Sequence, residues 1–313
     1  MTDKTYSIII IGAGPAGLAA AVYTSREKIS TLILEKGLCG GWASVSDLIE
    51  NYPGFPKGIK GQELADSFKR QALKFGAEII EFTEVKNIKP VNGKIKIITD
   101  KQEYNCYAAI VATGTAPKKL GIPGEEKFIG KGVSFCATCD GPLFKNKNII
   151  VVGGGNAALE ETLFLSRFAK KVTLIHRRDE FRGTKMLQEE LKLQKNVEFL
   201  LNHELVSIEG KKYVDSVIAQ NKKTKEQKTV EAQGVFIYVG FLPNSEILKG
   251  IVDFDESGFV KTDDKMQTSK AGIFAAGDIR SKTVYQIITA CAEGVVAALS
   301  VRDYLKQIRQ EPK

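Results

Sequence analysis

The stretch Ser7-Ile-Ile-Ile-Ile11 followed by Gly12-Ala-Gly-Pro-Ala-Gly17 decides the fold of this chain, and it recurs in a second form. The second copy is Asn148-Ile-Ile-Val-Val152 followed by Gly153-Gly-Gly-Asn-Ala-Ala158. Each copy has a short apolar run, then a motif of the form G-x-G-x-x-G or G-x-G-x-x-A, then an apolar segment with helical character. This order predicts a strand, a tight turn and a helix, which open a dinucleotide-binding β-α-β unit.

A further strand is expected after each helix, at Thr31–Leu34 in the first copy and at Val172–Ile175 in the second. The two glycine motifs begin 141 residues apart, so each belongs to its own domain. Two polar stretches that contain Gly and Pro are the expected hinges, at Gly114–Lys119 and Val239–Asn244. The chain is therefore predicted to be α/β, with two Rossmann-like dinucleotide-binding domains, the second inserted into the first.

The end of the second strand in each copy indicates which nucleotide is bound. Glu35 stands 23 residues after the start of the first motif, and His176 with Arg177 and Arg178 stands at the same distance after the second. A carboxylate at this point hydrogen-bonds the free ribose hydroxyls of FAD or NAD and repels a 2′-phosphate, whereas arginines bind that phosphate in NADP. We therefore expect FAD in the first copy and NADPH in the second.

Arginine is scarce here, which makes its clustering informative. Of 45 basic residues only nine are Arg, and three of these, Arg177, Arg178 and Arg182, lie within six positions. A guanidinium group binds phosphate with a planar fork of donors, so the cluster supports a phosphate site. The net charge of +8 is otherwise spread among acidic residues, without a dense basic tract with interleaved aromatics, so we expect no nucleic-acid partner.

These assignments predict the domain boundaries. Residues 1–117 form the first part of the FAD-binding domain, residues 118–243 the NADPH-binding domain with the redox cysteines, and residues 244–313 the second part of the FAD-binding domain. In the last part, Gly272–Asp278 reads as a strand that ends in a turn, and a long amphipathic helix is expected over Val284–Leu305.

Five cysteines include one close pair, Cys136-Ala-Thr-Cys139, followed by Asp140. A structural zinc site would need two more ligands, and the chain has only two histidines and three isolated cysteines, so no metal is expected. Two inert buried thiols are the other alternative. The C-x-x-C spacing favours a redox pair, in which one thiol attacks an outside disulfide and the other closes the internal one. Cys39, Cys106 and Cys291 are expected to be core thiols.

The apolar stretch Ser7–Tyr23 is long enough to resemble a signal peptide or a membrane span. Its glycines and its proline, and the lack of a preceding basic cluster, favour the strand, turn and helix instead. No other run reaches the roughly 18–20 apolar residues that a spanning helix needs. An odd number of cysteines is also unlike a secreted disulfide framework. We expect a cytoplasmic protein that does not bind membranes.

The order of motifs resembles that of the low-molecular-weight thioredoxin reductases along nearly the whole chain. The matching pieces are Gly12 to Gly17, Glu35, Asn51-Tyr-Pro-Gly54, Ala112-Thr-Gly114, Cys136 to Asp140, Gly153 to Ala158, His176-Arg-Arg178 with Arg182, and Gly277-Asp278.

The resemblance implies a homodimer that passes electrons from NADPH through FAD and a disulfide to thioredoxin or a thioredoxin-like protein. It implies that Cys139 faces the flavin, that Cys136 exchanges with thioredoxin, and that Asp140 handles protons near the pair. The implied FAD-binding residues are Gly12, Gly14, Pro15, Ala16, Gly17, Glu35, Gly41, Trp42, Asn51, Thr113, Gly114, Gly277, Asp278 and Gln286. The implied NADPH-binding residues are Gly153, Gly155, Asn156, Ala158, His176, Arg177, Arg178 and Arg182.

The chain departs from the family pattern in the flavin loop, where Gly40-Gly41-Trp42 stands in place of the common Gly-Gly-Gln. Some relatives take electrons from ferredoxin or a deazaflavin and tend to lose the arginine motif, so its retention at Arg177 and Arg178 favours NADPH. Such another donor, and a flavoprotein that only binds a partner without catalysis, are the alternative interpretations.

Overall fold

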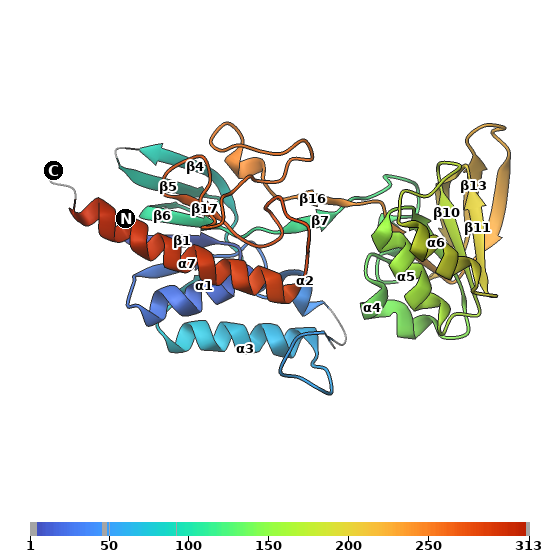
Figure 1. Cartoon of the computed structure of the whole chain (residues 1–313), viewed down its shortest axis with the longest axis horizontal. Coiled ribbons are helices and arrows are strands. Elements are labelled where there is room, and N and C mark those ends of the chain that lie inside the picture. The colour runs from blue at the N-terminus through green and yellow to red at the C-terminus, as the bar shows by residue number, and fades with distance from the viewer. Residues whose placement is uncertain (1–4, 46–48, 50, 92, 311–313) are drawn as a thin grey trace. The chain divides into compact units, whose positions relative to one another are not determined.

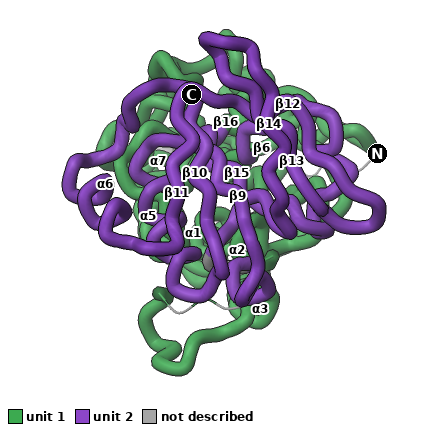
Figure 2. The backbone as a smooth tube through the Cα atoms, turned by 90° about the vertical axis from the view of Figure 1, so that its right-hand side faces the viewer, with its two compact units in different colours: residues 1–116, 242–313 green, residues 117–241 purple. Residues whose placement is uncertain are grey.

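The computed structural model describes residues 5–45, 49, 51–91 and 93–310, and the side chains of 138, 139, 309 and 310 lie outside this description. The chain forms two compact units: unit 1 comprises residues 1–116 and 242–313, and unit 2 comprises residues 117–241 (Figure 2). The boundaries expected from sequence lie one residue later at the first crossing and two residues later at the second.

The chain passes between the units twice, and the two crossings pair with each other. They are β7 (Thr115–Pro117) and β16 (Phe241–Pro243), which form a two-stranded sheet. On the unit 1 side, the amide of Asn244 donates to the carbonyl of Gly114 at 2.9 Å. On the unit 2 side, the amide of Lys118 donates to the carbonyl of Gly240 at 2.9 Å. The two polypeptide connections are thus one paired ribbon.

Unit 1 is built on a seven-stranded sheet in the order β3-β2-β1-β6-β5-β4, with β17 paired to the second half of β6. Figure 1 labels β1, β4, β5, β6 and β17 of this sheet. Strands β1, β2, β3, β6 and β17 run parallel, whereas β4 and β5 form an antiparallel extension. The strands are β1 (Thr5–Ile11), β2 (Thr31–Leu34), β3 (Glu78–Ile80), β4 (Val85–Val91), β5 (Lys94–Thr99), β6 (Glu103–Val111) and β17 (Ile273–Ala275). The helices are α1 (Pro15–Arg26), α2 (Gly41–Ser44), α3 (Gly61–Lys74), the short 3₁₀ helix η3 (Glu246–Leu248) and α7 (Ile287–Gln310).

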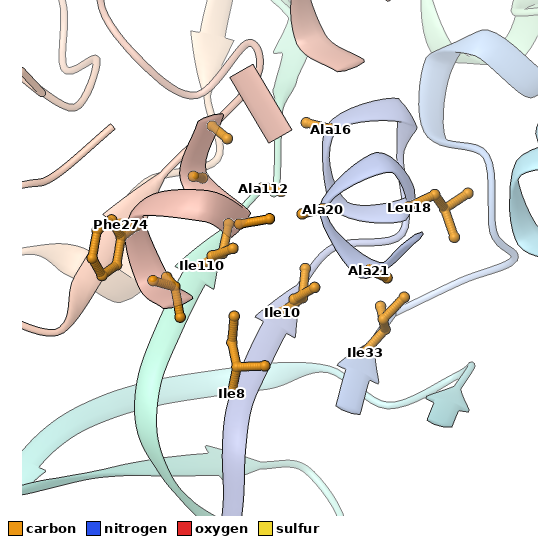
Figure 3. Packing of buried hydrophobic residues seen from close by; sticks show 14 of the residues in the cluster. Ile8, Ile10, Ala16, Leu18, Ala20, Ala21, Ile33, Ile110, Ala112 and Phe274 are labelled. Carbon is orange, nitrogen blue, oxygen red and sulfur yellow. The ribbon is translucent and has the colours of Figure 1, made fainter. Parts of the chain in front are cut away.

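The central strand β1 is buried on both faces, as its unbroken isoleucine run predicts for a parallel strand covered on each side. Its side chains alternate between two clusters. Ile8 and Ile10 pack under the small residues Ala20 and Ala21 of α1 (Figure 3), and Ile9 belongs to the cluster on the opposite face. Alanines let α1 lie close to the sheet, which brings the start of this helix to the end of β1.

Unit 2 repeats the same plan with a five-stranded parallel sheet in the order β11-β10-β9-β15-β8, joined by an antiparallel sheet β12-β13-β14. The parallel strands are β8 (Val133–Ser134), β9 (Asn148–Gly153), β10 (Lys171–His176), β11 (Val197–Leu201) and β15 (Gly234–Tyr238), and the others are β12 (His203–Gly210), β13 (Val214–Asn221) and β14 (Gln227–Glu231). The helices are η1 (Glu126–Phe128), α4 (Ala137–Asp140), η2 (Gly141–Phe144), α5 (Asn156–Ser166) and α6 (Lys185–Lys192). In both units the glycine motif follows the central strand.

The C-terminal helix begins three residues later than the sequence suggests. We expected it from Val284, whereas α7 begins at Ile287. The hydroxyl of Thr289 lies 3.2 Å from the carbonyl of Val284 and 2.9 Å from that of Gln286, and it also accepts the amide of Gln286. This side chain therefore closes a turn ahead of the helix and sets where the helix starts. None of the described helices is long and apolar enough to cross a membrane.

Helix α5 carries one half-buried carboxyl, that of Glu161. Glu161 follows the buried Ala158 by three positions and precedes the buried Leu165 by four, so it lies on the same face of the helix. Burial raises its pKa to about 7, and the neighbouring charge of Glu160 adds to the shift. At neutral pH this carboxyl is therefore poised between its protonated and ionised forms.

We expect the stability of the protein to depend on pH through Glu161. The usual pKa of the side chain is 4.5, so the folded chain keeps a proton that the unfolded chain has released. The stabilisation from this proton is complete below about pH 4.5 and is lost as the pH rises through 7. Glu161→Gln should therefore be more stable than the parent at pH 8, by roughly 2–3 kcal/mol, and equal to it near pH 4.5.

Urea unfolding between pH 4.5 and pH 8 measures this difference. Glu189→Gln on the exposed face of α6 is the matched control, since it removes a carboxyl that is already in water. A constant difference between Glu161→Gln and the parent over this range would contradict the buried titration.

Candidate functional site

The first glycine motif combines two crowded positions with one open position. Gly12 has φ +100°, and a Cβ placed there would lie 2.5 Å from the carbonyl oxygen of Ala112. A Cβ at Gly17 would lie 1.9 Å from the carbonyl oxygen of Gly12, so both positions require glycine for close packing. In contrast, nothing lies within 4 Å of a Cβ built on Gly14. The turn is therefore tight on its protein side and open on its outer side.

The second motif has the same division. A Cβ at Gly153 would lie 2.5 Å from both the Cβ of Ala158 and the carbonyl oxygen of Tyr238. Space is again open at Gly155, which begins α5 as Gly14 begins α1. The sequence difference between the motifs, Ala158 in place of a third glycine, leaves this open position unchanged.

Both helices present free backbone donors at these open positions. Neither the N-cap of α1 nor that of α5 is filled by a side chain, and neither first turn contains an acidic residue. The first amides of a helix need an acceptor, and the helix dipole favours an anion there. A pyrophosphate satisfies both requirements, so each motif fits the dinucleotide that its sequence predicts.

Glu35 lies at the end of β2, beside the first motif. Its Oε2 accepts the amide of Ala13 at 2.7 Å, and its Oε1 accepts the amide of Gly37 at 2.9 Å. The carboxylate thus ties the glycine motif to the following loop. Its position at the strand end is the one from which an acid reaches the ribose of a nucleotide on the motif.

The flavin-loop residues gather on the same side of unit 1. The amide of Gly40 donates to the carbonyl of Ala13 at 2.8 Å, and a Cβ on Gly41 would lie 3.4 Å from the Cα of Gly14. Trp42 is half exposed, and its indole N–H donates to the carbonyl of Thr115 at 2.8 Å. The tryptophan that departs from the family pattern thus connects this loop to the first strand of the ribbon.

Other predicted flavin residues are joined in pairs across large sequence separations. The side-chain amide of Asn51 donates to that of Gln286 at 3.0 Å. Thr113 exchanges two hydrogen bonds of 2.8 Å with Asn244, and the amide of Asn244 also donates to Gly114. These contacts draw the end of β6 and the returning chain together in unit 1.

A charged cluster holds Gly277 and Asp278 in place. The carboxylate of Glu293 on α7 accepts the amide of Gly277 at 2.8 Å and pairs with Arg280 at 3.1 Å and Lys282 at 3.4 Å. Lys282 also pairs with Asp278 at 2.9 Å. Glu293 and the two cations are largely buried, so they act with little screening by water. Sequence reasoning did not identify Glu293, because no local pattern joins it to the turn.

The arginine cluster of unit 2 lies beside the second motif. Arg177 and Arg178 follow β10 and are exposed, as is Arg182. The amide of Arg182 donates to the carbonyl of Gly154 at 2.7 Å, which fastens this arm to the glycine motif. The side-chain oxygen of Asn156 accepts the amide of Thr184 at 2.9 Å and holds the arm from the other side. The three guanidinium groups therefore belong to a segment fixed against the open helix start.

His176 differs from the arginines that follow it because it is buried. Its ring packs against Phe181 at 5.4 Å, and a Cβ on Gly154 would lie 2.3 Å from the ring. Burial lowers its pKa, and the charges of Arg182 and Arg178 lower it further, so the imidazole is neutral. The buried ring of His176 therefore packs directly against Gly154 of the second glycine motif.

Cys136 is disulfide-bonded, and Cys39, Cys106 and Cys291 are free buried thiols. Burial raises the pKa of Cys39 and Cys106 to about 12 and that of Cys291 to about 11, which keeps these thiols protonated and unreactive. The expectation that they are core thiols is confirmed. The side chain of Cys139 lies outside the described residues, so its pairing with Cys136 stays a prediction.

Hydrogen bonds from side chains and from the following turn hold the backbone around the redox motif. The hydroxyl of Ser134 accepts the amide of Cys136 at 3.0 Å, and the carbonyl of Cys136 accepts the amide of Asp140 at 3.1 Å. The hydroxyl of Tyr238 accepts the amide of Ala137 at 2.5 Å. Sequence reasoning did not identify Tyr238, which lies 101 residues from its partner.

Comparisons of sequence and of structure with known proteins point to one family. The model of the pyridine nucleotide-disulphide oxidoreductase family matches residues 6–294. A thioredoxin reductase of Bacillus subtilis (strain 168) is 44% identical over 314 residues, which cover 99% of this chain and 98% of the relative. A crystal structure of thioredoxin reductase from Lactococcus lactis is 40% identical, with a TM-score of 0.80 over 96% of this chain and 99% of that one.

A thioredoxin reductase structure from Streptococcus pyogenes is also 40% identical, with a TM-score of 0.79 over 98% of this chain and 100% of that one. These structures and the parallel strands at the centre of both sheets confirm the predicted α/β class with two Rossmann-like units. The identity extends over nearly the whole length of both partners, far beyond the glycine motifs alone. The chain belongs to the pyridine nucleotide-disulphide oxidoreductase family and is related to its low-molecular-weight thioredoxin reductases.

Proposed function

We propose that this chain is an NADPH-dependent, FAD-containing thioredoxin-disulfide reductase whose working disulfide joins Cys136 and Cys139. One observation carries the proposal. Unit 2 holds a disulfide-bonded Cys136 together with an uncapped glycine motif flanked by three exposed arginines, while unit 1 holds a second uncapped motif flanked by a carboxylate. Family membership supports the use of a flavin and a pyridine nucleotide.

Unit 1 is the unit that we assign to FAD. The amides at the start of α1 would bind the pyrophosphate, and Glu35 would accept the ribose hydroxyls. Gly41 and the Asn51–Gln286 pair belong to the same unit and would contact the flavin end, with Asp278 held by its ion pair to Lys282. The remaining contacts would come from the other residues predicted for this site: Pro15, Ala16, Trp42, Thr113, Gly114 and Gly277.

Unit 2 is the unit that we assign to NADPH. The amides at the start of α5 would bind the pyrophosphate, and Arg177, Arg178 and Arg182 would surround the 2′-phosphate. A carboxylate at the first position after β10 would repel the phosphate. Arginines occupy the first two positions here, and the first carboxylate is that of Asp179 at the third. The arginine set also favours NADPH over a ferredoxin or deazaflavin donor.

The chemistry of the chain itself is thiol–disulfide exchange. The bound nucleotides supply hydride transfer from NADPH to FAD and two electrons for the disulfide. The thiolate of Cys136 would then attack a disulfide of the protein substrate, and Cys139 would resolve the mixed disulfide, re-forming the internal bond and releasing a dithiol. Asp140, which lies one residue after Cys139 in α4, would exchange protons with the pair.

Thioredoxin or a thioredoxin-like protein is the partner that we propose, in agreement with the names of the relatives. Further parts of the proposal are a homodimer and a cytoplasmic location.

The function is tested directly by following NADPH oxidation with purified flavin-loaded protein. We expect rapid bleaching of the flavin on addition of NADPH, and sustained NADPH oxidation once an oxidised bacterial thioredoxin is present. Bleaching without turnover of any thioredoxin would leave a flavoprotein of another function, and no bleaching at all would favour a different electron donor.

Removing the arginines should change nucleotide preference. Two charge-assisted hydrogen bonds at roughly 1.5–3 kcal/mol each correspond to a loss of about 10²- to 10⁴-fold in kcat/KM for NADPH in the double variant Arg177→Ala, Arg178→Ala. Activity with NADH should be unaffected, since NADH lacks the 2′-phosphate. Arg167→Ala, an exposed arginine at the end of α5, is the control for loss of charge alone. An unaltered NADPH to NADH ratio in the double variant argues against the assignment.

The roles of the two cysteines should separate by absorption spectroscopy. In Cys136→Ser the remaining thiolate of Cys139 should lie against the oxidised flavin and produce a long-wavelength charge-transfer band. In Cys139→Ser the remaining thiol faces the substrate, and the band should be absent. Spectra recorded across pH 6–9 measure the band and its titration. The opposite pattern would mean that the two roles are exchanged.

A further inference from the structure

Tyr238, the last residue of β15, contacts two functional segments of unit 2 through different atoms. Its backbone pairs in register with Gly153, the first glycine of the second motif. Its carbonyl oxygen would be 2.5 Å from a Cβ at Gly153, so the two backbones are as close as glycine permits. At the other end of the same residue, the phenolic oxygen lies 2.5 Å from the amide of Ala137 in the redox turn.

The amide of Ala137 is the first of helix α4 and has no partner within the helix. Ala137 is fully buried, and the N-cap residue Cys136 provides no side-chain cap. A buried amide without an acceptor is strongly unfavourable, so the phenolic oxygen fills a definite requirement of this turn. It acts together with Ser134, which binds the preceding amide, and the two hydroxyls fix consecutive peptide groups on either side of Cys136.

The hydroxyl of Tyr238 is kept neutral by its surroundings. Burial raises its pKa well above the usual value, and the carboxyls of Glu161 on α5 and Asp140 on α4 raise it further. A neutral hydroxyl accepts the amide with a lone pair and keeps its own proton for donation. The phenol therefore remains a hydrogen-bonding group throughout the pH range in which a thiolate forms.

We propose that Tyr238 is a positioning residue for disulfide chemistry: its hydroxyl holds the turn that carries Cys136 and Cys139 at a set place relative to the nucleotide motif at Gly153. The inference rests on the proposed function of that turn. A phenol that merely filled the core would affect stability alone, whereas a positioning phenol affects the step that uses the disulfide and spares the step that does not.

The test is Tyr238→Phe in the flavin-loaded enzyme, a change that removes one oxygen and keeps the ring. Two activities are compared. NADPH-dependent reduction of thioredoxin needs the disulfide, whereas NADPH-dependent reduction of ferricyanide needs the flavin and does not need the disulfide. We expect thioredoxin turnover to fall by about tenfold, the scale of one lost hydrogen bond at a positioned group, with ferricyanide reduction and the KM for NADPH unchanged. Tyr213→Phe, in which an exposed hydroxyl of the same unit is removed, is the control.

A second readout does not depend on activity. Hydrogen exchange at the Ala137 amide should be slow in the parent and at least tenfold faster in Tyr238→Phe, in the absence of substrates. Unchanged exchange, or an equal loss of both activities, would overturn the inference. If the parent reduces ferricyanide but no thioredoxin, the proposed function fails instead, and the exchange rates still decide whether the phenol holds the turn.

Discussion

The free backbone amides at the start of α1 and α5 are the constraint on which the rest of the structure depends. A helix that begins without a side-chain cap needs an external acceptor, and here both helices begin at a glycine with open space beside it. To bring each helix start to the end of a central strand, the chain needs small residues where helix and strand cross. This accounts for the crowded glycines at Gly12, Gly17 and Gly153 and for the alanines along α1.

The same motif can be proposed for two ligands because the groups that would select between them come from elsewhere in each unit. In unit 1 a carboxylate, Glu35, binds the motif through the Ala13 amide, and in unit 2 Arg182 binds the motif through the Gly154 carbonyl. In each case the residue that would discriminate between nucleotides is also fastened to the loop that would hold their common pyrophosphate. In both units the proposed selecting residue and the glycine motif are thus held together by a hydrogen bond.

The redox turn depends on a different principle, in which hydroxyl groups substitute for a helix cap. Helix α4 has only four residues and provides few hydrogen bonds of its own. Ser134 and Tyr238, from two strands of the same sheet, supply acceptors for consecutive amides. The short helix is thus anchored to the sheet by side chains on both sides of Cys136.

Much of this protein was readable from sequence, because the decisive signals are local. The two isoleucine- and valine-rich strands with their glycine motifs, the residues at the ends of the second strands and the C-x-x-C pair each lie within a few positions of one another. Such patterns express backbone geometry and ligand chemistry directly. They predicted the family and the fold class, which the comparisons confirm, and they gave the expected place of each nucleotide. The start of α7 was misjudged by three residues because the hydroxyl of Thr289 closes a turn that propensity does not reveal.

Tertiary structure decided everything that depends on residues far apart in the chain. Glu293 contacts the Gly277 turn, Asn51 contacts Gln286, and Tyr238 contacts Ala137, and the partners in each pair are far apart in the sequence. Burial, likewise, is a property of the packed fold. It lowers the pKa of His176, which keeps the imidazole neutral, and it raises the pKa of Glu161 to about 7. The sequence by itself determined which chemical groups are present and in what order. The fold decided which of them touch and how far each is removed from water, because hydrogen bonding and desolvation act over a few ångströms in space, whatever the distance along the chain.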